Sequence, residues 1–133
     1  MNFQVNPSSS QPIYRQLSQQ IREGIAQGRL APEDQLPSVR ELSKMLVVNP
    51  NTIAKVYTEL EREGVLTTRP GLGVFVTQPR IELTKAIRVQ KLQESLDVCM
   101  TSAVYLGFDA DEFRQIVEAR LGKYQWNLVK GKK

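Results

Sequence analysis

The fold is decided by residues 38–76, SVRELSKMLVVNPNTIAKVYTELEREGVLTTRPGLGVFV. Ser38 followed three residues later by Glu41 is typical of a capping box, so a short helix is predicted to begin there. Asn49 and the proline after it predict the cap and first residue of a second helix, which Gly64 ends. The stretch therefore predicts two short helices separated by a brief break.

After the second helix the pattern changes from helical to β. Residues 65–69 and 74–77 are rich in β-branched and aromatic side chains, and the Pro-Gly-Leu-Gly run at 70–73 between them is typical of a turn. These segments predict a two-stranded hairpin. Two short helices followed by such a hairpin are the pattern of a winged helix-turn-helix, whose second helix can enter a DNA major groove of ~12 Å width.

Upstream of this stretch, a further helix is predicted over residues 12–27, where apolar side chains recur every fourth position and Gly28 ends the pattern. Residues 1–9 are expected to form an extended arm, and residues 29–36 a loop. We therefore expect residues 1–78 to form a winged helix-turn-helix DNA-binding domain.

Residues 79–133 have a different character. A long apolar stripe from Ile81 to Leu106 predicts one helix, and Asp109 with Glu112 caps another. Two helices with so much apolar surface predict pairing with a second copy. The fold class expected is mainly α with a small β-hairpin: the winged helix-turn-helix domain followed by a two-helix C-terminal dimerisation extension. Residues 125–133 are expected to be loose. The apolar residues expected to be buried in the two-helix extension include Cys99, Phe113, Ile116, Val117 and Leu121.

The outward positions of the helix from Pro50 to Glu63 indicate that it binds DNA. They hold one amide, two hydroxyls and one ammonium, without a carboxylate among them, whereas the acidic residues gather at the far end of the helix. Such side chains suit base edges and phosphates. Two copies would present two of these helices, so a palindromic operator with half-sites ~34 Å apart is predicted. The outward residues are Asn51, Thr52, Lys55 and Thr58.

Composition narrows the function classes. The chain has 133 residues, a net charge of +4, no histidine and one cysteine. These counts exclude zinc sites built from Cys and His, internal disulfides and triads with a His base. No phosphate loop or pair of acids favours an enzyme, and we expect no cofactor and no metal. The start of the chain lacks a signal peptide, and the apolar runs are too short to span a membrane, so a cytoplasmic protein is expected.

Four motifs, at residues 36–43, 48–57, 60–64 and 69–76, resemble the DNA-binding domain of the GntR family of bacterial transcription regulators. The short two-helix extension resembles that of the YtrA-like subgroup. The resemblance implies a transcription regulator. The likeness to the YtrA-like subgroup implies a repressor, which would act on an operon for a membrane transporter. The chain departs from many members at Pro50 and Ala54, where they carry arginine, so their base-reading scheme does not transfer.

The resemblance also implies roles for six residues. Arg40 would contact the DNA backbone or a guanine, Asn51, Thr52 and Lys55 would read or clamp the major groove, and Gly71 would approach the minor groove with Arg69 on a phosphate. Each has a plain structural interpretation as well. Arg40, Lys55 and Arg69 could each be an ordinary surface residue. Thr52 could cap the helix through its hydroxyl, and Gly71 could serve only to form the turn.

Three alternatives remain open at this stage. A winged helix also serves as a protein-interaction scaffold, and a non-specific DNA-binding protein would carry the same basic and polar groups. A small-molecule effector is compatible with the fold, but two helices are expected to be too few to enclose a pocket of ~300 Å³ within one subunit. An effector site between subunits would lie near Tyr105, Phe108 or Trp126.

Overall fold

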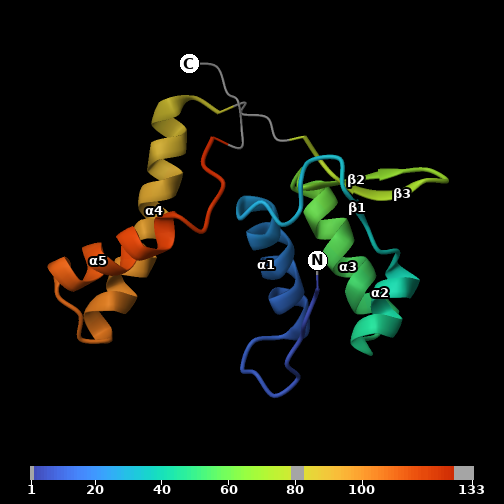
Figure 1. The fold of residues 1–133 in the computed structure, drawn as a ribbon, viewed down its shortest axis with the longest axis horizontal. Coiled ribbons are helices and arrows are strands. Elements are labelled where there is room, and N and C mark those ends of the chain that lie inside the picture. Colours follow the sequence, from blue (N-terminus) through green and yellow to red (C-terminus); the bar gives the residue numbers. More distant parts are fainter. Residues whose placement is uncertain (1, 79–82, 128–133) are drawn as a thin grey trace. The chain divides into compact units, whose positions relative to one another are not determined.

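A computed structural model describes residues 2–78 and 83–127 (Figure 1). The described residues divide into two compact units: residues 2–78 with 125–127, and residues 83–124. Each unit is described by itself. The predicted contributions of Ile81 and of residues 128–133 lie outside the described residues.

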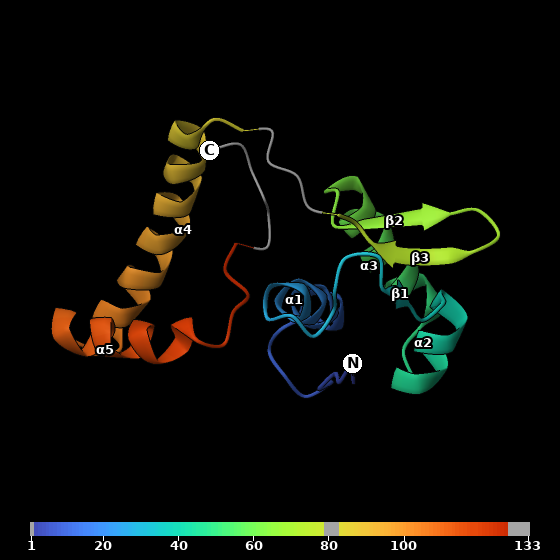
Figure 2. The same cartoon turned by 45° about the horizontal axis from the view of Figure 1, so that its top comes forward.

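The first unit contains three helices and a small sheet. The helices are α1 (Ile13–Ala26), α2 (Val39–Leu46) and α3 (Pro50–Arg62), and the strands are β1 (Gln35–Leu36), β2 (Leu66–Arg69) and β3 (Gly73–Val76). Figure 2 shows the β2–β3 hairpin, which we call the wing, projecting beyond the helices of this unit. The predicted class, mainly helical with a small β element, is confirmed.

The helix starts are fixed by the predicted caps. The backbone N–H of Glu41 donates to Ser38 Oγ at 3.0 Å, and the Ser38 N–H donates to Glu41 Oε1 at 3.0 Å. The hydrogen bonds from Ser38, first from its backbone, lower the pKa of the Glu41 carboxyl. In α3 the Asn49 side chain accepts from the N–H of Asn51 at 2.8 Å. These bonds satisfy amides that a helix start otherwise leaves unpaired.

One apolar core joins the helices to the sheet. Leu17 and Ile21 of α1, Ile53 and Leu60 of α3, and Leu66 of β2 are fully or almost fully buried in it. The core also includes Phe3, so the segment expected to be an extended arm at the start of the chain is packed into the core at this position. Burying an aromatic side chain is favourable enough to hold an extended segment against the helices.

The side chain of Tyr57 connects α3 to the turn before α2. Its hydroxyl donates a 2.7 Å hydrogen bond to the carbonyl of Pro37. Burial, and secondarily the charge of Glu41, raise the pKa of this phenol, so it stays protonated as a donor. The bond helps to fix the helix that carries the outward polar residues relative to α2.

The sheet has a third strand, β1, within the segment expected to be a loop. β1 pairs antiparallel with β3, with Gln35 opposite Phe75 and Leu36 opposite Val74, which gives the strand order β1-β3-β2. The predicted hairpin is confirmed as β2 and β3, whereas the expectation that residues 29–36 form only a loop is wrong at Gln35 and Leu36. A two-residue strand has no alternating pattern of its own, because its pairing is set by a partner some 40 residues later in the chain.

The break between α2 and α3 contains a strained residue. Val47 has φ of +53° in the left-handed region, although it is β-branched, and its side chain is 91% exposed. A β-branched side chain is unfavourable in this conformation, and little packing offsets the cost. The strain is tolerated because it lets the chain turn between two helices that are both anchored in the core.

Replacing Val47 with asparagine is expected to stabilise the protein by about 1 kcal/mol, because asparagine tolerates the left-handed conformation better. Urea denaturation of the variant and of wild type measures the difference. Val47→Ala serves as a control, since it removes the branch without adding a preference for that conformation, and it is expected to gain less. A loss of stability in Val47→Asn would contradict the assignment of strain.

The second unit consists of α4 (Lys85–Tyr105) and α5 (Ala110–Leu121). Thr84 caps α4, and Asp109 with Glu112 forms the predicted capping box of α5. Neither helix buries a residue within the single chain. Cys99 is exposed, so its expected burial is not found there. The predicted inward face of α5 is likewise uncovered in one copy: Ile116, Val117 and Leu121 are exposed and Phe113 is half-buried.

Within the described parts of the chain, no helix is long and apolar enough to cross a membrane.

Candidate nucleic-acid interface

The outward face of α3 is polar, as the sequence pattern predicted. Asn51, Lys55 and Thr58 are exposed, and Thr52 is half-buried. The opposite face is anchored in the core by Ile53, Val56, Tyr57 and Leu60, all buried. Because the buried face fixes the rotation of the helix, the polar side chains are held on one side of it.

The start of α3 settles what caps the helix. Asn49 is the N-cap, and its side chain and its carbonyl accept from the backbone N–H groups of Asn51 and Thr52, respectively. The capping role considered for the Thr52 hydroxyl therefore belongs to Asn49. Two of the amides that could have faced a phosphate are already paired, so contacts from this end depend mainly on side chains.

Lys55 is exposed but is not an isolated surface lysine. Its Nζ lies 4.8 Å from the centroid of the Tyr14 ring, which belongs to α1. A cation over the face of an aromatic ring is attracted by the ring's quadrupole. The contact holds the ammonium beside α1, and nothing in the helical spacing of α3 indicated it.

The wing places its tip away from the core. Gly71 is exposed, with φ of +75°, and a Cβ on it would meet no atom within 4 Å. The turn is closed by the N–H of Leu72, which donates to the carbonyl of Arg69 at 2.9 Å. A glycine with open space around it allows the backbone to approach another molecule closely.

Arg69, at the base of this turn, already has two partners. Its guanidinium forms an ion pair with Glu33 and lies 4.4 Å from the centroid of the Phe75 ring. Arg69 was predicted to contact a phosphate, and the sequence pattern gave no sign of a competing carboxylate. Glu33 lies 36 positions away in the chain, so no local motif joins the two residues.

Arg40 is exposed on α2, beside the capping residue Glu41. The first unit thus carries all six predicted residues on three elements. Arg40 comes from α2, the trio Asn51, Thr52 and Lys55 from α3, and the pair Arg69 and Gly71 from the wing. Their roles toward DNA stay predictions.

The described residues contain no group of three or more His, Cys, Asp or Glu side chains placed to hold a metal ion. The outward face of α3 carries an amide, two hydroxyls and one ammonium, on Asn51, Thr52, Thr58 and Lys55. This chemistry suits recognition of base edges and phosphates.

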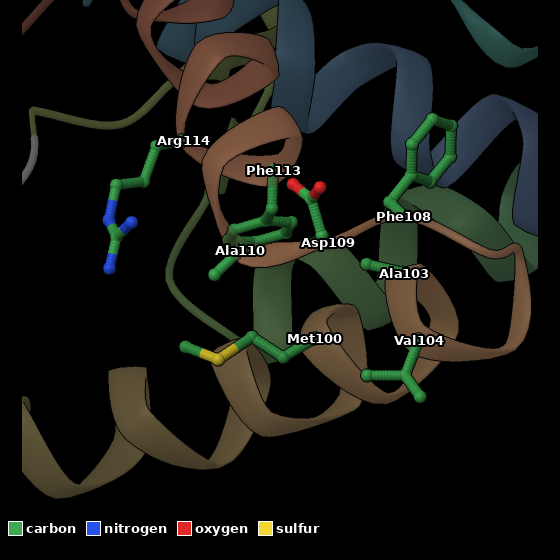
Figure 3. Close-up of a pocket in the computed structure, with 8 residues that line it drawn as sticks. All are labelled: Met100, Ala103, Val104, Phe108, Asp109, Ala110, Phe113 and Arg114. Carbon is green, nitrogen blue, oxygen red and sulfur yellow. The ribbon is translucent and has the colours of Figure 1, made fainter.

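The second unit contains an apolar pocket between α4 and the start of α5 (Figure 3). Its volume is about 360 Å³, but the two helices leave it open to solvent rather than enclosing it, since Val104 and Phe108 in its lining are 72% and 41% exposed. Its two charged lining residues are already engaged: Asp109 accepts from the N–H of Glu112, and Arg114 pairs with Asp111 at 2.7 Å. The other lining residues are Met100, Ala103, Val104, Phe108, Ala110 and Phe113.

Comparison with known families identifies one that matches the first unit. The family described as "Bacterial regulatory proteins, gntR family" matches residues 13–76, from the start of α1 to the end of β3. The HTH-type transcriptional repressor YtrA of Bacillus subtilis (strain 168) is 36% identical over 116 residues, which are 87% of this chain and 89% of that protein. The match to YtrA extends beyond the family segment.

Solved structures show the same fold. A transcriptional antiterminator from Listeria monocytogenes EGD-e aligns with a TM-score of 0.76 and 32% identity, over 90% of this chain and 89% of that one. YtrA from Sulfolobus acidocaldarius, described as a GntR-family transcription factor, aligns with a TM-score of 0.55 and 35% identity, over 71% of this chain and 97% of that one. These relatives are described as a transcriptional repressor, a transcriptional antiterminator and a transcription factor.

Proposed function

Because the chain belongs to the GntR family of DNA-binding transcriptional regulators, we propose that it acts as a homodimeric repressor on a palindromic operator. The observation that supports this proposal most strongly is the outward face of α3. It combines amide, hydroxyl and ammonium groups on a helix whose other face is fully anchored. A helix of this kind can place its first turns against base edges in the major groove.

The proposed contacts divide by chemistry. Asn51 and Thr52 offer hydrogen bonds to base edges, and Lys55 offers a charge to a base or a phosphate. Gly71 lets the wing backbone approach the minor groove, while Arg40 and Arg69 supply cations for the DNA backbone. In this division the side chains of α3 provide sequence discrimination, and the arginines and the wing provide position and affinity.

The dimer is supported by the apolar surface of the second unit. Leu92, Val98 and Val104 of α4 are 69–72% exposed, and α5 adds Ile116 and Val117 at 45% and 38%. Exposed apolar side chains on both helices are unfavourable for a monomer in water, and a second copy would cover them. We therefore assign DNA binding to residues 1–78 and dimerisation to residues 79–133.

Repression is proposed from the relative in Bacillus subtilis, which is named a transcriptional repressor. A protein that binds operator DNA in a bacterium acts in the cytoplasm, and we place it there. An effector is not needed for this proposal.

Asn51→Ala is expected to weaken operator binding by about 5- to 150-fold for each reading helix, because one good bidentate base contact contributes about 1–3 kcal/mol. Lys55→Ala is expected to weaken binding and to lower its dependence on salt. Fluorescence anisotropy titration of a labelled operator duplex measures both effects. Lys91→Ala on α4 makes the same charge change outside the first unit and is the matched control.

The same variants test the scaffold alternative. If Asn51→Ala and Lys55→Ala stay dimeric and bind DNA as well as wild type does, α3 does not read DNA, and a protein-interaction scaffold is favoured. A non-specific DNA-binding protein would lose affinity in Lys55→Ala but would show no discrimination between operator and random duplexes in any variant.

A further inference from the structure

The segment that precedes α2 runs along the wing and is bonded to it beyond β1. The N–H of Glu33 donates to the carbonyl of Val76 at 2.9 Å, and the N–H of Val76 donates to the carbonyl of Asp34 at 2.9 Å. The side-chain amide of Gln35 donates to the carbonyl of Leu72 at 2.8 Å, next to the wing tip. Backbone and side-chain bonds therefore hold residues 33–35 against the wing.

This arrangement fixes where the Glu33 carboxylate lies. Glu33 has φ of +75°, a left-handed conformation that a residue with a Cβ rarely adopts, and the backbone bond to Val76 holds it there. From this position its carboxylate pairs with the guanidinium of Arg69, which also lies over the Phe75 ring. The ion pair is thus built into the fold of the wing.

The exposure of this ion pair indicates whether it acts on stability or on local charge. The side chains of Arg69 and Glu33 are 41% and 56% exposed. Ion pairs with such exposure contribute little to stability, because water and salt screen them. Their effect on the local charge is larger: residues 1–79 carry eight basic and seven acidic side chains, so the charge of one wing arginine is a large part of what this unit can offer a polyanion.

We propose that Glu33 limits how strongly the wing binds DNA, because its carboxylate competes with a backbone phosphate for the guanidinium of Arg69. Binding then exchanges the carboxylate for the phosphate and leaves Glu33 near the DNA. This inference rests on the proposed function. According to this inference, Glu33 lies outside the helix-turn-helix and the wing but influences the affinity for DNA. It does so by pairing with Arg69 and not by contacting DNA itself.

Glu33→Gln is expected to bind duplex DNA about two- to fivefold more tightly at low salt, the range expected for losing one exposed ion pair. The slope of log affinity against log salt is expected to steepen by up to about 0.9 for each subunit, because Arg69 then displaces a counterion from a phosphate without losing a carboxylate partner. Titrations at four salt concentrations, on an operator duplex and on a random duplex, measure both quantities.

A double-mutant cycle decides whether Glu33 acts through Arg69. In the Arg69→Ala background, Glu33→Gln is expected to give no further gain. Glu61→Gln is the matched control, because it removes the same charge from the same unit. The Glu61 carboxylate accepts a 2.6 Å hydrogen bond from the Thr68 hydroxyl instead of pairing with Arg69. This variant is expected to bind as wild type does.

Two results would overturn the inference: Glu33→Gln binding no more tightly than wild type, or gaining as much in the Arg69→Ala background. Failure of the proposed function looks different, because wild type would then show equal affinity for the operator and random duplexes. The random duplex still has phosphates, so the cycle on it tests the competition in either case. Circular dichroism melts of all variants check that each is folded.

Discussion

Leu92→Glu is expected to convert the protein to a monomer and to weaken binding to an inverted-repeat operator by about 10²- to 10⁴-fold. Leu92 lies on α4 and is 69% exposed in the single chain. In the proposed dimer it is buried against the second copy, where an unpaired carboxylate would be strongly unfavourable. Losing the dimer removes the advantage of binding two half-sites at once, which is the source of that factor.

Gln90→Glu is the matched control for this change. Gln90 is exposed on the same helix, two positions earlier and so on nearly the opposite side, and the substitution adds the same charge. Light scattering measures the molecular mass of each variant, and anisotropy titration measures its affinity for DNA. Leu92→Glu that remains dimeric and binds with wild-type affinity would contradict dimerisation through this face of α4.

Leu60→Ala is expected to lower the free energy of unfolding of the first unit by about 2–5 kcal/mol. Leu60 has no exposed surface and belongs to the core that includes residues of α1 and β2. Its truncation leaves a cavity that anchored helices cannot easily close. Since α3 carries the outward polar face, the variant is also expected to lose DNA binding at temperatures where wild type still binds.

Leu72→Ala makes the same chemical change at the wing tip, where the side chain is 67% exposed. It is expected to change the free energy of unfolding by less than about 0.5 kcal/mol. Denaturant titration at one fixed protein concentration compares the two, because dimerisation would make stability depend on concentration. Equal losses in both variants would contradict the assignment of Leu60 to the core.

Most of the helices were predictable because their signals are local. The capping box at Ser38 and Glu41, and the cap at Asn49, each lie within four residues of the helix that they begin. The apolar side chains at every fourth position of α1 include Leu17, Ile21 and Ile25, which are buried in the core. These signals do not depend on distant parts of the chain, so they can be recognised in the sequence alone.

The features that were missed depend on distant partners or on backbone strain. β1 exists because Gln35 and Leu36 pair with β3, and two residues are too few for a pattern. The ion pair of Glu33 with Arg69 joins positions far apart in the chain. The left-handed backbone of Val47 contradicts the preference of its own side chain, so no residue-based rule predicts it.

In the candidate site, too, features with a local sequence signal were predicted, and contacts between distant residues were not. Helical spacing correctly predicted the outward face of α3 at Asn51, Lys55 and Thr58. It did not predict that Lys55 would lie over Tyr14, because that contact depends on how α1 and α3 pack. The exposure of Cys99 also differs from expectation, since an apolar helical stripe does not reveal whether its cover comes from the same chain.

Selection of bound duplexes from a random DNA pool, using the purified full chain, tests the central claim most directly. We expect an enriched inverted repeat whose half-sites are about one helical turn, ~34 Å, apart. We also expect this repeat to bind at least about 10³-fold more tightly than random DNA at physiological salt. No enriched motif, together with binding that disappears at that salt concentration, would contradict operator recognition by this protein.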